Sequence, residues 1–248
     1  MSLVRVLSPL VDLVLPPRCP GCGVLVEGDL QFCAECWNAL RFISDPCCQS
    51  CGKPFGDGRD DDLTCAECLA DPPQHDGIRA AVIYDDLSRS IVLKLKHGGK
   101  IGLARLVARH LQRHLPGERR DLVLVPVPLH RWRLWQRGFN QSILIARALA
   151  APHGLPVETD VLRRIRATPP LKGMTRKQRS QAIRGVFDIP GERRCRIAGK
   201  HVLLVDDVYT TGATTRACVR LLKQAGAARV TIFCWARVLR DGDEGAGI

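Results

Sequence analysis

Eight cysteines in the first third of the chain have the spacing of metal ligands. Two thiolates separated by two residues can converge on one ion, and two such pairs complete the tetrahedral four-sulfur shell of a structural zinc site. Four such pairs therefore predict about two Zn²⁺ ions per chain. The pairs are Cys19 and Cys22, Cys33 and Cys36, Cys48 and Cys51, and Cys65 and Cys68.

The pairs can be combined in two ways. Gaps of 10, 11 and 13 residues separate successive pairs, and each gap is long enough for a small hairpin. Sequential pairing, with one site from the first two pairs and one from the last two, is the simplest arrangement. A cross-braced arrangement, joining the first pair to the third and the second to the fourth, is the alternative. We do not expect a disulfide framework, because two-residue spacing closes poor loops and no export signal is recognisable.

A second group of functional residues lies in segment 202–217, VLLVDDVYTTGATTRA. This order of residues predicts a buried strand, two acids, a loop of small residues and the start of a helix. Asp206 and Asp207, expected at the strand end, can accept hydrogen bonds from ribose hydroxyls or bind Mg²⁺. Backbone amides at the start of a helix can surround a phosphate group. The residues expected to supply them are Thr210, Thr211, Gly212, Ala213 and Thr214.

Segment 124–142, LVPVPLHRWRLWQRGFNQS, combines a predicted strand with several arginines. The planar guanidinium groups of Arg131, Arg133 and Arg137 suit phosphate oxygens. Trp132 and Trp135 alternate with them, so we expect salt-dependent binding of single-stranded nucleic acid. The alternative is a solvated loop in which the tryptophans are anchors.

Alternating strands and helices are predicted from residue 78 onward. Apolar runs predict strands over 80–84, 122–127, 202–205 and 230–235. Helical periodicity is present over 88–96, 103–115, 140–150 and 214–224. The pattern predicts an α/β fold with a mostly parallel sheet and flanking helices. Ligands of such folds bind at the carboxyl ends of the strands.

Charge divides the chain at about the same place. Residues 1–80 have a net charge of −6 and residues 81–248 a net charge of +18, which together give +12. With Asp71, Pro72 and Pro73 as a linker, this predicts a small module over 1–75 and an α/β domain over 76–248. The basic domain favours polyanionic partners, and both phosphorylated small molecules and nucleic acid qualify.

Residues 3–15 are mostly apolar, but Arg5, Pro9 and Asp12 interrupt them. Their apolar positions recur at helical spacing, which predicts a short amphipathic helix. We expect neither a signal peptide nor membrane insertion, and therefore a cytoplasmic protein.

Segment 202–217 resembles the signature of type I phosphoribosyltransferases that binds 5-phosphoribosyl 1-pyrophosphate (PRPP). The whole chain is similar to the ComF family. The cysteine pairs, the LKLKHGGK stretch at 93–100, the Arg-Gly-Phe-Asn-Gln stretch at 137–141, the Thr-Pro-Pro stretch at 168–170 and the PRPP signature follow in ComF order. This resemblance implies a double zinc ribbon over 1–75 and a type I phosphoribosyltransferase domain over 76–248.

The resemblance also implies site residues and partners. Pro128, Leu129 and His130 would form a pyrophosphate-binding loop. The Arg-Gly-Phe-Asn-Gln stretch at 137–141 would face the site, with Arg137, Asp206 and Asp207 as catalytic residues. Segment 166–189 is similar to the mobile hood loop that closes over PRPP, although a basic linker is the alternative reading. A link to DNA uptake in competence, with DNA-uptake or recombination proteins as partners, is implied as well.

The expected activity is transfer of phosphoribose from PRPP and Mg²⁺ to an acceptor. The C1 to pyrophosphate bond would break through an oxocarbenium-like state, with Mg²⁺ and arginines stabilising the departing pyrophosphate. Purine-salvage relatives usually have an acid where this chain has Thr210, so we do not expect a purine acceptor. The alternative function is a non-catalytic module that binds nucleotide or single-stranded nucleic acid.

Overall fold

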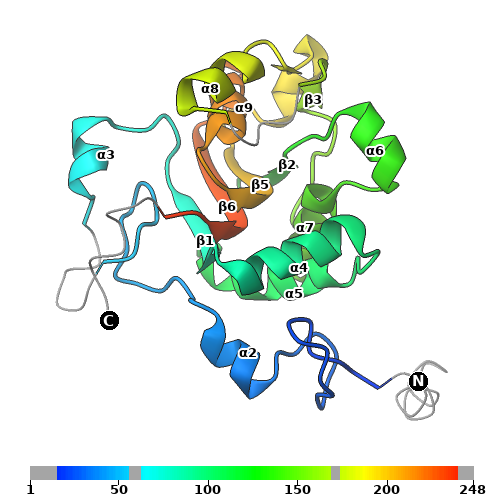
Figure 1. Ribbon diagram of the computed structural model, residues 1–248. Helices are drawn as coiled ribbons and strands as arrows, with labels where there is room; N and C mark the ends of the chain where they lie inside the picture. Colours follow the sequence, from blue (N-terminus) through cyan, green and yellow to red (C-terminus); the bar gives the residue numbers. More distant parts are fainter. Residues whose placement is uncertain (1–15, 56–62, 169–173, 240–248) are drawn as a thin grey trace.

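The structure is a computed structural model that describes residues 16–55, 63–168 and 174–239 (Figure 1). The predicted N-terminal helix, as well as Pro169 and Pro170 of the predicted hood, lies outside these residues. Within them, no helix is both long and apolar enough to cross a lipid bilayer.

A four-stranded parallel sheet forms the centre of the described part of the chain. Its order is β1-β6-β5-β2. These strands consist largely of buried aliphatic residues, as expected where helices cover both faces of a sheet. The predicted parallel α/β fold is therefore confirmed. The bounds are β1 (Ile78–Ile83), β6 (Arg229–Arg237), β5 (His201–Tyr209) and β2 (Leu122–Pro126).

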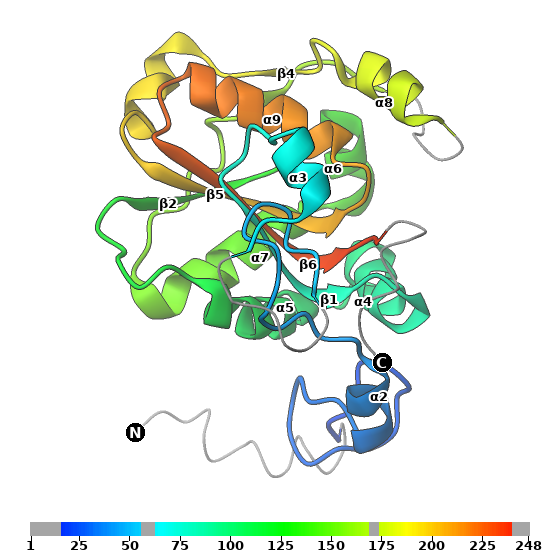
Figure 2. The same cartoon turned by 90° about the vertical axis from the view of Figure 1, so that its left-hand side faces the viewer.

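Helices lie on both faces of the sheet (Figures 1 and 2). Because side chains alternate along a strand, Leu203 and Val205 pack on one layer while Val202 and Leu204 pack on the other. The first layer contains α4 (Asp86–His97), α5 (Leu103–Leu111), η1 (Gln112–His114), α7 (Gln141–Ala150) and η2 (Ala151–His153). The second contains α9 (Ala213–Gln224), β3 (Arg163–Arg164), α8 (Arg176–Ile183), β4 (Phe187–Asp188) and η3 (Gly191–Arg196).

Strand β5 is longer than its apolar run predicts. It continues to Tyr209 because β6 provides a backbone partner throughout, with Asp206 opposite Cys234 and Tyr209 opposite Arg237. The expectation that Asp206 and Asp207 follow the strand was therefore wrong. They lie inside it, so their side chains project to opposite sides of the sheet.

Segment 131–137, for which a solvated loop was the alternative expectation, forms helix α6 (Arg131–Arg137). His130 caps its start by accepting a hydrogen bond from the Trp132 backbone N–H, and Gly138 ends it with a φ of 76°. The predicted hood also contains a helix, α8, which begins at a capping box between Thr175 and Gln178.

The cysteine-rich segment packs directly on the sheet. It contains two short helices, α2 (Ala34–Ala39) and α3 (Ala66–Ala70). Between them, Phe42 forms an antiparallel bridge with Val82 of β1, and Leu40 and Ile43 are buried in the two core clusters. The division into domains at residue 75 remains a prediction.

Candidate functional site

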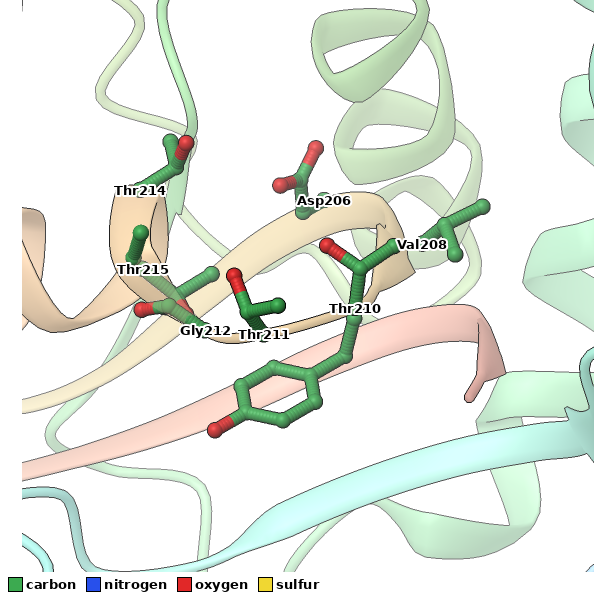
Figure 3. A pocket seen from close by; sticks show the side chains of 9 residues that line it. Asp206, Val208, Thr210, Thr211, Gly212, Thr214 and Thr215 are labelled. Carbon is green, nitrogen blue, oxygen red and sulfur yellow. Dashed lines mark hydrogen bonds between the residues drawn. The ribbon is translucent and has the colours of Figure 1, made fainter. Parts of the chain in front are cut away.

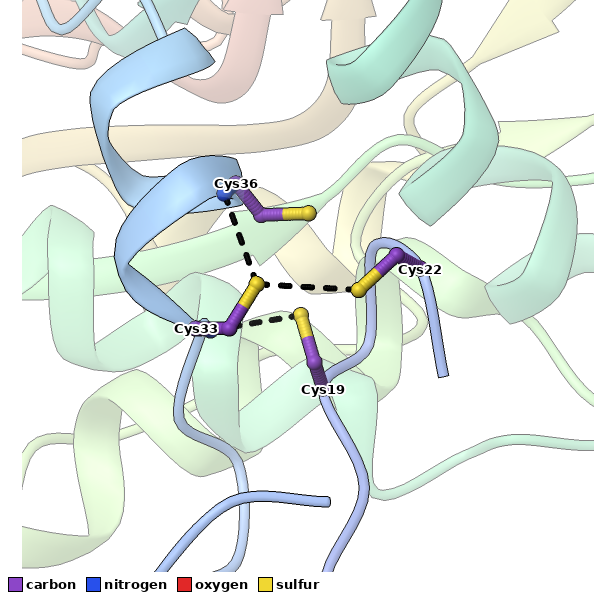
Figure 4. Close-up of side chains that lie close together, drawn as sticks. All are labelled: Cys19, Cys22, Cys33 and Cys36. Atoms are coloured by element: carbon purple, nitrogen blue, oxygen red, sulfur yellow. Dashed lines mark hydrogen bonds between the residues drawn. The ribbon is translucent and has the colours of Figure 1, made fainter. Parts of the chain in front are cut away.

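Two clusters of four cysteines lie on the cysteine-rich segment. The first contains Cys19, Cys22, Cys33 and Cys36 (Figure 4), and the second contains Cys48, Cys51, Cys65 and Cys68. All Sγ atoms within a cluster lie within 4.8 Å of one another. Sequential pairing is therefore the observed arrangement, and the cross-braced alternative is wrong.

The dimensions of both clusters fit zinc. Cys22 Sγ lies 3.6 Å from Cys33 Sγ, and Cys51 Sγ lies 3.8 Å from Cys65 Sγ. Zinc bound tetrahedrally to four sulfurs at about 2.3 Å places them about 3.8 Å apart. Burial alone would raise the pKa of Cys19, but the backbone N–H groups of Cys33, Cys22 and Gly21 lower it to about 6. The clusters are thus two structural zinc sites of the zinc-ribbon type.

A pocket lies where β5 leads into α9 (Figure 3). Asp206 projects from β5 beside the turn that carries Thr211 and Gly212. Gly212 has a φ of 71°, a left-handed conformation that glycine adopts most readily, and precedes α9 directly. The first N–H groups of a helix have no acceptor within it, so they can bind an anion. The lining residues are Asp206, Val208, Tyr209, Thr210, Thr211, Gly212, Ala213, Thr214 and Thr215.

The adjacent acids have different surroundings. Asp206 lines the pocket, and its Oδ1 accepts hydrogen bonds from Ser142 Oγ at 3.3 Å and from the Asp207 N–H at 2.9 Å. Burial, followed by the neighbouring charge of Asp207, raises the pKa of Asp206 to about 7. Asp207 is buried, and its Oδ2 lies 2.6 Å from Lys96 Nζ and accepts from Gln141 Nε2 at 3.1 Å.

Arg137 reaches the acids through a side-chain amide. Its Nη1 donates to Gln141 Oε1 at 3.5 Å, and Gln141 in turn donates to Asp207. Burial and the nearby Arg133 lower the pKa of Arg137, whereas the charge of Asp207 opposes this shift. The structure thus connects Arg137 to Asp207 through one intervening residue.

The predicted pyrophosphate loop follows β2, the strand beside β5. Pro128, Leu129 and His130 therefore lie at the carboxyl end of the strands, as the pocket does. The Asn140 side chain donates to the Val127 carbonyl at 3.0 Å, which fixes the start of α7 against this loop. His130 serves as the cap of α6.

Sequence reasoning assigned no role to Lys96 or Ser142, and placed Gln141 only in a stretch facing the site, although all three contact the acids. Each belongs to a stretch noted for its family resemblance, LKLKHGGK or the segment through Ser142. The family resemblance identified these stretches. The spacing of residues along the sequence did not indicate that all three contact Asp206 or Asp207 on β5.

Two family models match different parts of the chain. The double zinc ribbon domain matches residues 10–69. The phosphoribosyl transferase domain matches residues 140–244, which include the pocket.

Curated relatives align over most of the chain. DNA utilization protein YhgH of Salmonella typhi is 31% identical over 236 residues, covering 92% of this chain and 100% of the relative. Competence protein F of Haemophilus influenzae is 26% identical over 225 residues, covering 88% of this chain and 90% of the relative. Competence protein ComFC of Bacillus subtilis is 27% identical over 222 residues, with 86% and 87% covered.

Proposed function

Because the chain belongs to the ComF family, with a double zinc ribbon and a phosphoribosyltransferase domain, we propose that it binds PRPP with Mg²⁺ at the β5–α9 pocket. The observation that carries this proposal is that Asp206 and the loop of residues 210–214 line one pocket at the carboxyl end of a parallel sheet. Such a site offers an anion cradle and a carboxylate side by side.

Each part of the pocket has a role in this proposal. The amides of residues 211–214 bind the 5-phosphate, and the hydroxyls of Thr210, Thr211 and Thr214 add donors. Asp206 accepts from a ribose hydroxyl or ligates Mg²⁺, which usually binds through one or two carboxylates together with substrate phosphates. Mg²⁺, when bound, would neutralise part of the negative charge of the pyrophosphate group.

We further propose phosphoribosyl transfer, in which pyrophosphate leaves C1 and an acceptor replaces it. Arg137 lies near Asp207, where its guanidinium can stabilise pyrophosphate oxygens. Thr210 has no carboxylate to assist a purine nitrogen, so we propose an acceptor other than a purine. The names of the relatives support a role in DNA uptake or utilization.

Thermal unfolding with PRPP and Mg²⁺ tests the binding site. A ligand at about 100 times its Kd stabilises the native state by about 2.7 kcal/mol, which raises the Tm by several degrees. Asp206→Asn and Thr211→Glu should largely remove the shift. Asp121→Asn is the matched control and should retain the Tm shift. Asp121 is exposed and directly precedes β2, at the amino end of the strands and therefore away from the pocket. No shift in the wild type would show that the pocket does not bind PRPP.

Single-stranded nucleic acid is a second candidate ligand, because α6 presents two exposed tryptophans. Trp132 and Trp135 are 61% and 77% exposed, and their rings stack with centroids 5.3 Å apart. Arg131 and Arg133 lie on the same helix. Exposed aromatic rings among cationic side chains are the means by which proteins bind single strands without sequence preference.

A further inference from the structure

Helix α4 carries two lysines that reach different parts of the molecule. Lys94 Nζ donates to the carbonyls of Pro20 at 2.5 Å and Gly21 at 2.7 Å. These carbonyls lie between the first two ligands of the first cysteine cluster. Lys96 Nζ lies 2.6 Å from Asp207 Oδ2. Two positions on one helix thus contact a zinc site and the candidate ligand site.

The Lys96 contact is not an ordinary surface ion pair. The side chains of Lys96 and Asp207 are only 23% and 7% exposed. A buried carboxylate requires a partner, and removing that partner is costly because an uncompensated charge remains. Lys96 and Gln141 together satisfy one oxygen of Asp207, whereas Asp206 is the carboxylate that lines the pocket.

The Lys94 contact stabilises the first cysteine turn. A zinc ion with four thiolates carries a net negative charge, and the carbonyls of Pro20 and Gly21 add dipoles of the same sense. A cation donating to both carbonyls offsets this charge. The contact also joins α4 directly to the first cluster, although Lys94 and Gly21 are far apart in the sequence.

Helix α4 is fixed in place between these contacts. Asp85 and Ser88 form a capping box at its start, and Ile91 and Leu95 are buried in the core. Residues two apart in a helix differ by about 3 Å along its axis, so the backbone positions of the two lysines are fixed relative to each other.

We propose that Lys96 is a positioning residue that holds Asp207, and that α4 couples the ligand site to the first cysteine cluster through Lys94. Asp207 is then paired within the protein, and Asp206 is the acid that contacts the ligand or its Mg²⁺. The coupling rests on the proposed function, because it concerns affinity for PRPP and Mg²⁺. Binding of PRPP favours the position of α4 in which the first cluster holds zinc, and zinc at that cluster favours PRPP binding by the same factor.

Calorimetric titration of PRPP and Mg²⁺ into the zinc-loaded full chain tests the role of Lys96. Lys96→Met and Asp207→Asn should each weaken PRPP binding at least about tenfold, as expected for losing a charged hydrogen bond. The double variant should bind no more weakly than either single variant. Lys100→Met, an exposed change in the loop after α4, should bind like the wild type.

Two further readouts separate positioning from a general loss of structure. Lys96→Met frees Asp207, so it should bind Mn²⁺ alone more tightly than the wild type, while Lys96→Arg should restore most of the PRPP affinity. If Lys96→Met does not fold, the double variant replaces it, because it leaves no unpaired charge. The proposal would be overturned if the losses of PRPP affinity in Lys96→Met and Asp207→Asn add up in the double variant. It would also be overturned if Lys96→Met binds PRPP as tightly as Lys100→Met.

Zinc release to a chromogenic chelator tests the coupling through Lys94. Saturating PRPP with Mg²⁺ should slow release from one cluster of the wild type about fivefold or more and leave the other unchanged. Lys94→Met should lose this protection while it still binds two equivalents of zinc and PRPP. If PRPP with Mg²⁺ slows zinc release equally in Lys94→Met and Lys100→Met, the coupling is contradicted. If the wild type itself fails to bind PRPP, the proposed function fails instead.

Discussion

The hydroxyl oxygen of Tyr209 lies 2.4 Å from the point that a Cβ atom on Gly212 would occupy. The end of β5 therefore packs directly beneath the candidate phosphate loop, with no space for a side chain at the turn. This close approach of Tyr209 and Gly212 fixes the position of the loop relative to the end of β5.

Gly212→Ala should distort the loop and weaken PRPP binding. The substitution forces a φ of 71° on a residue with a Cβ and adds a clash with Tyr209, so we expect a loss of about 1–3 kcal/mol in unfolding free energy. Chemical denaturation and thermal shift with PRPP and Mg²⁺ measure both effects. Gly117→Ala, where a Cβ would meet nothing within 4 Å, is the control. A Gly212→Ala variant that behaves like it would refute the assigned loop geometry.

Purified protein should contain about two zinc ions per chain, and Cys36→Ser should reduce this to about one. Only the first cluster loses a ligand, because the clusters share no cysteine. Cys47→Ser should keep both ions, since Cys47 Sγ donates to Asp45 Oδ1 at 3.1 Å outside the clusters. Elemental analysis gives the stoichiometry. Zinc near zero in the wild type, with disulfides in its place, would exclude the metal sites.

Acidification should destabilise the protein through His75. Burial and, to a smaller extent, Arg216 and Arg237 lower its pKa to about 4, against the effect of Asp76. Its Nδ1 accepts from the Gly77 N–H at 3.3 Å, which requires that nitrogen to be unprotonated. Between pH 6.5 and pH 4 the unfolded chain binds a proton that the native state does not, so stability falls as the pH falls.

The expected slope from this residue is up to about 1.4 kcal/mol per pH unit. Urea unfolding of the zinc-loaded protein at several pH values measures it, with His75→Asn as the non-titrating comparison. The variant should lose less stability than the wild type over this range. Parallel curves for the two proteins would contradict the assignment.

Single-stranded DNA should bind to α6 with an affinity that falls as salt increases. Replacing Trp132 and Trp135 by alanine should cost about 1–3 kcal/mol for each stacked base, whereas the double phenylalanine variant should retain most of the affinity. Fluorescence anisotropy of a labelled oligonucleotide over a salt series is the measurement. Absence of binding at low salt, or affinity independent of salt, would remove this candidate function.

Local patterns predicted the parts of the fold that depend on neighbouring residues. The cysteine pairs are local, so their spacing identified both zinc sites, and only their combination required the structure. Apolar runs located β1, β2, β5 and β6 because each is buried on both faces. The loop after β5 was found because the residues proposed to bind phosphate are contiguous in the sequence.

Contacts between distant segments were beyond sequence reasoning. The extension of β5 to Tyr209 depends on pairing with β6, which polar residues such as Asp206 do not indicate. Helix α6 has no buried residue among its seven, so no apolar periodicity indicated it. The pairing of Lys96 with Asp207 joins α4 to β5 and requires the fold itself.

The bridge between Phe42 and Val82 has a consequence for the solubility of the protein. Strand β1 lies at one border of the sheet, where unpaired backbone groups could recruit another chain. Ile43 N donates to the Ala81 carbonyl at 3.0 Å, and Ile83 N donates to the Arg41 carbonyl at 2.8 Å, so the segment between the cysteine clusters occupies this border. The zinc ribbons thereby hold this segment over the border of the sheet, and removing their metal should increase self-association of the protein through β1.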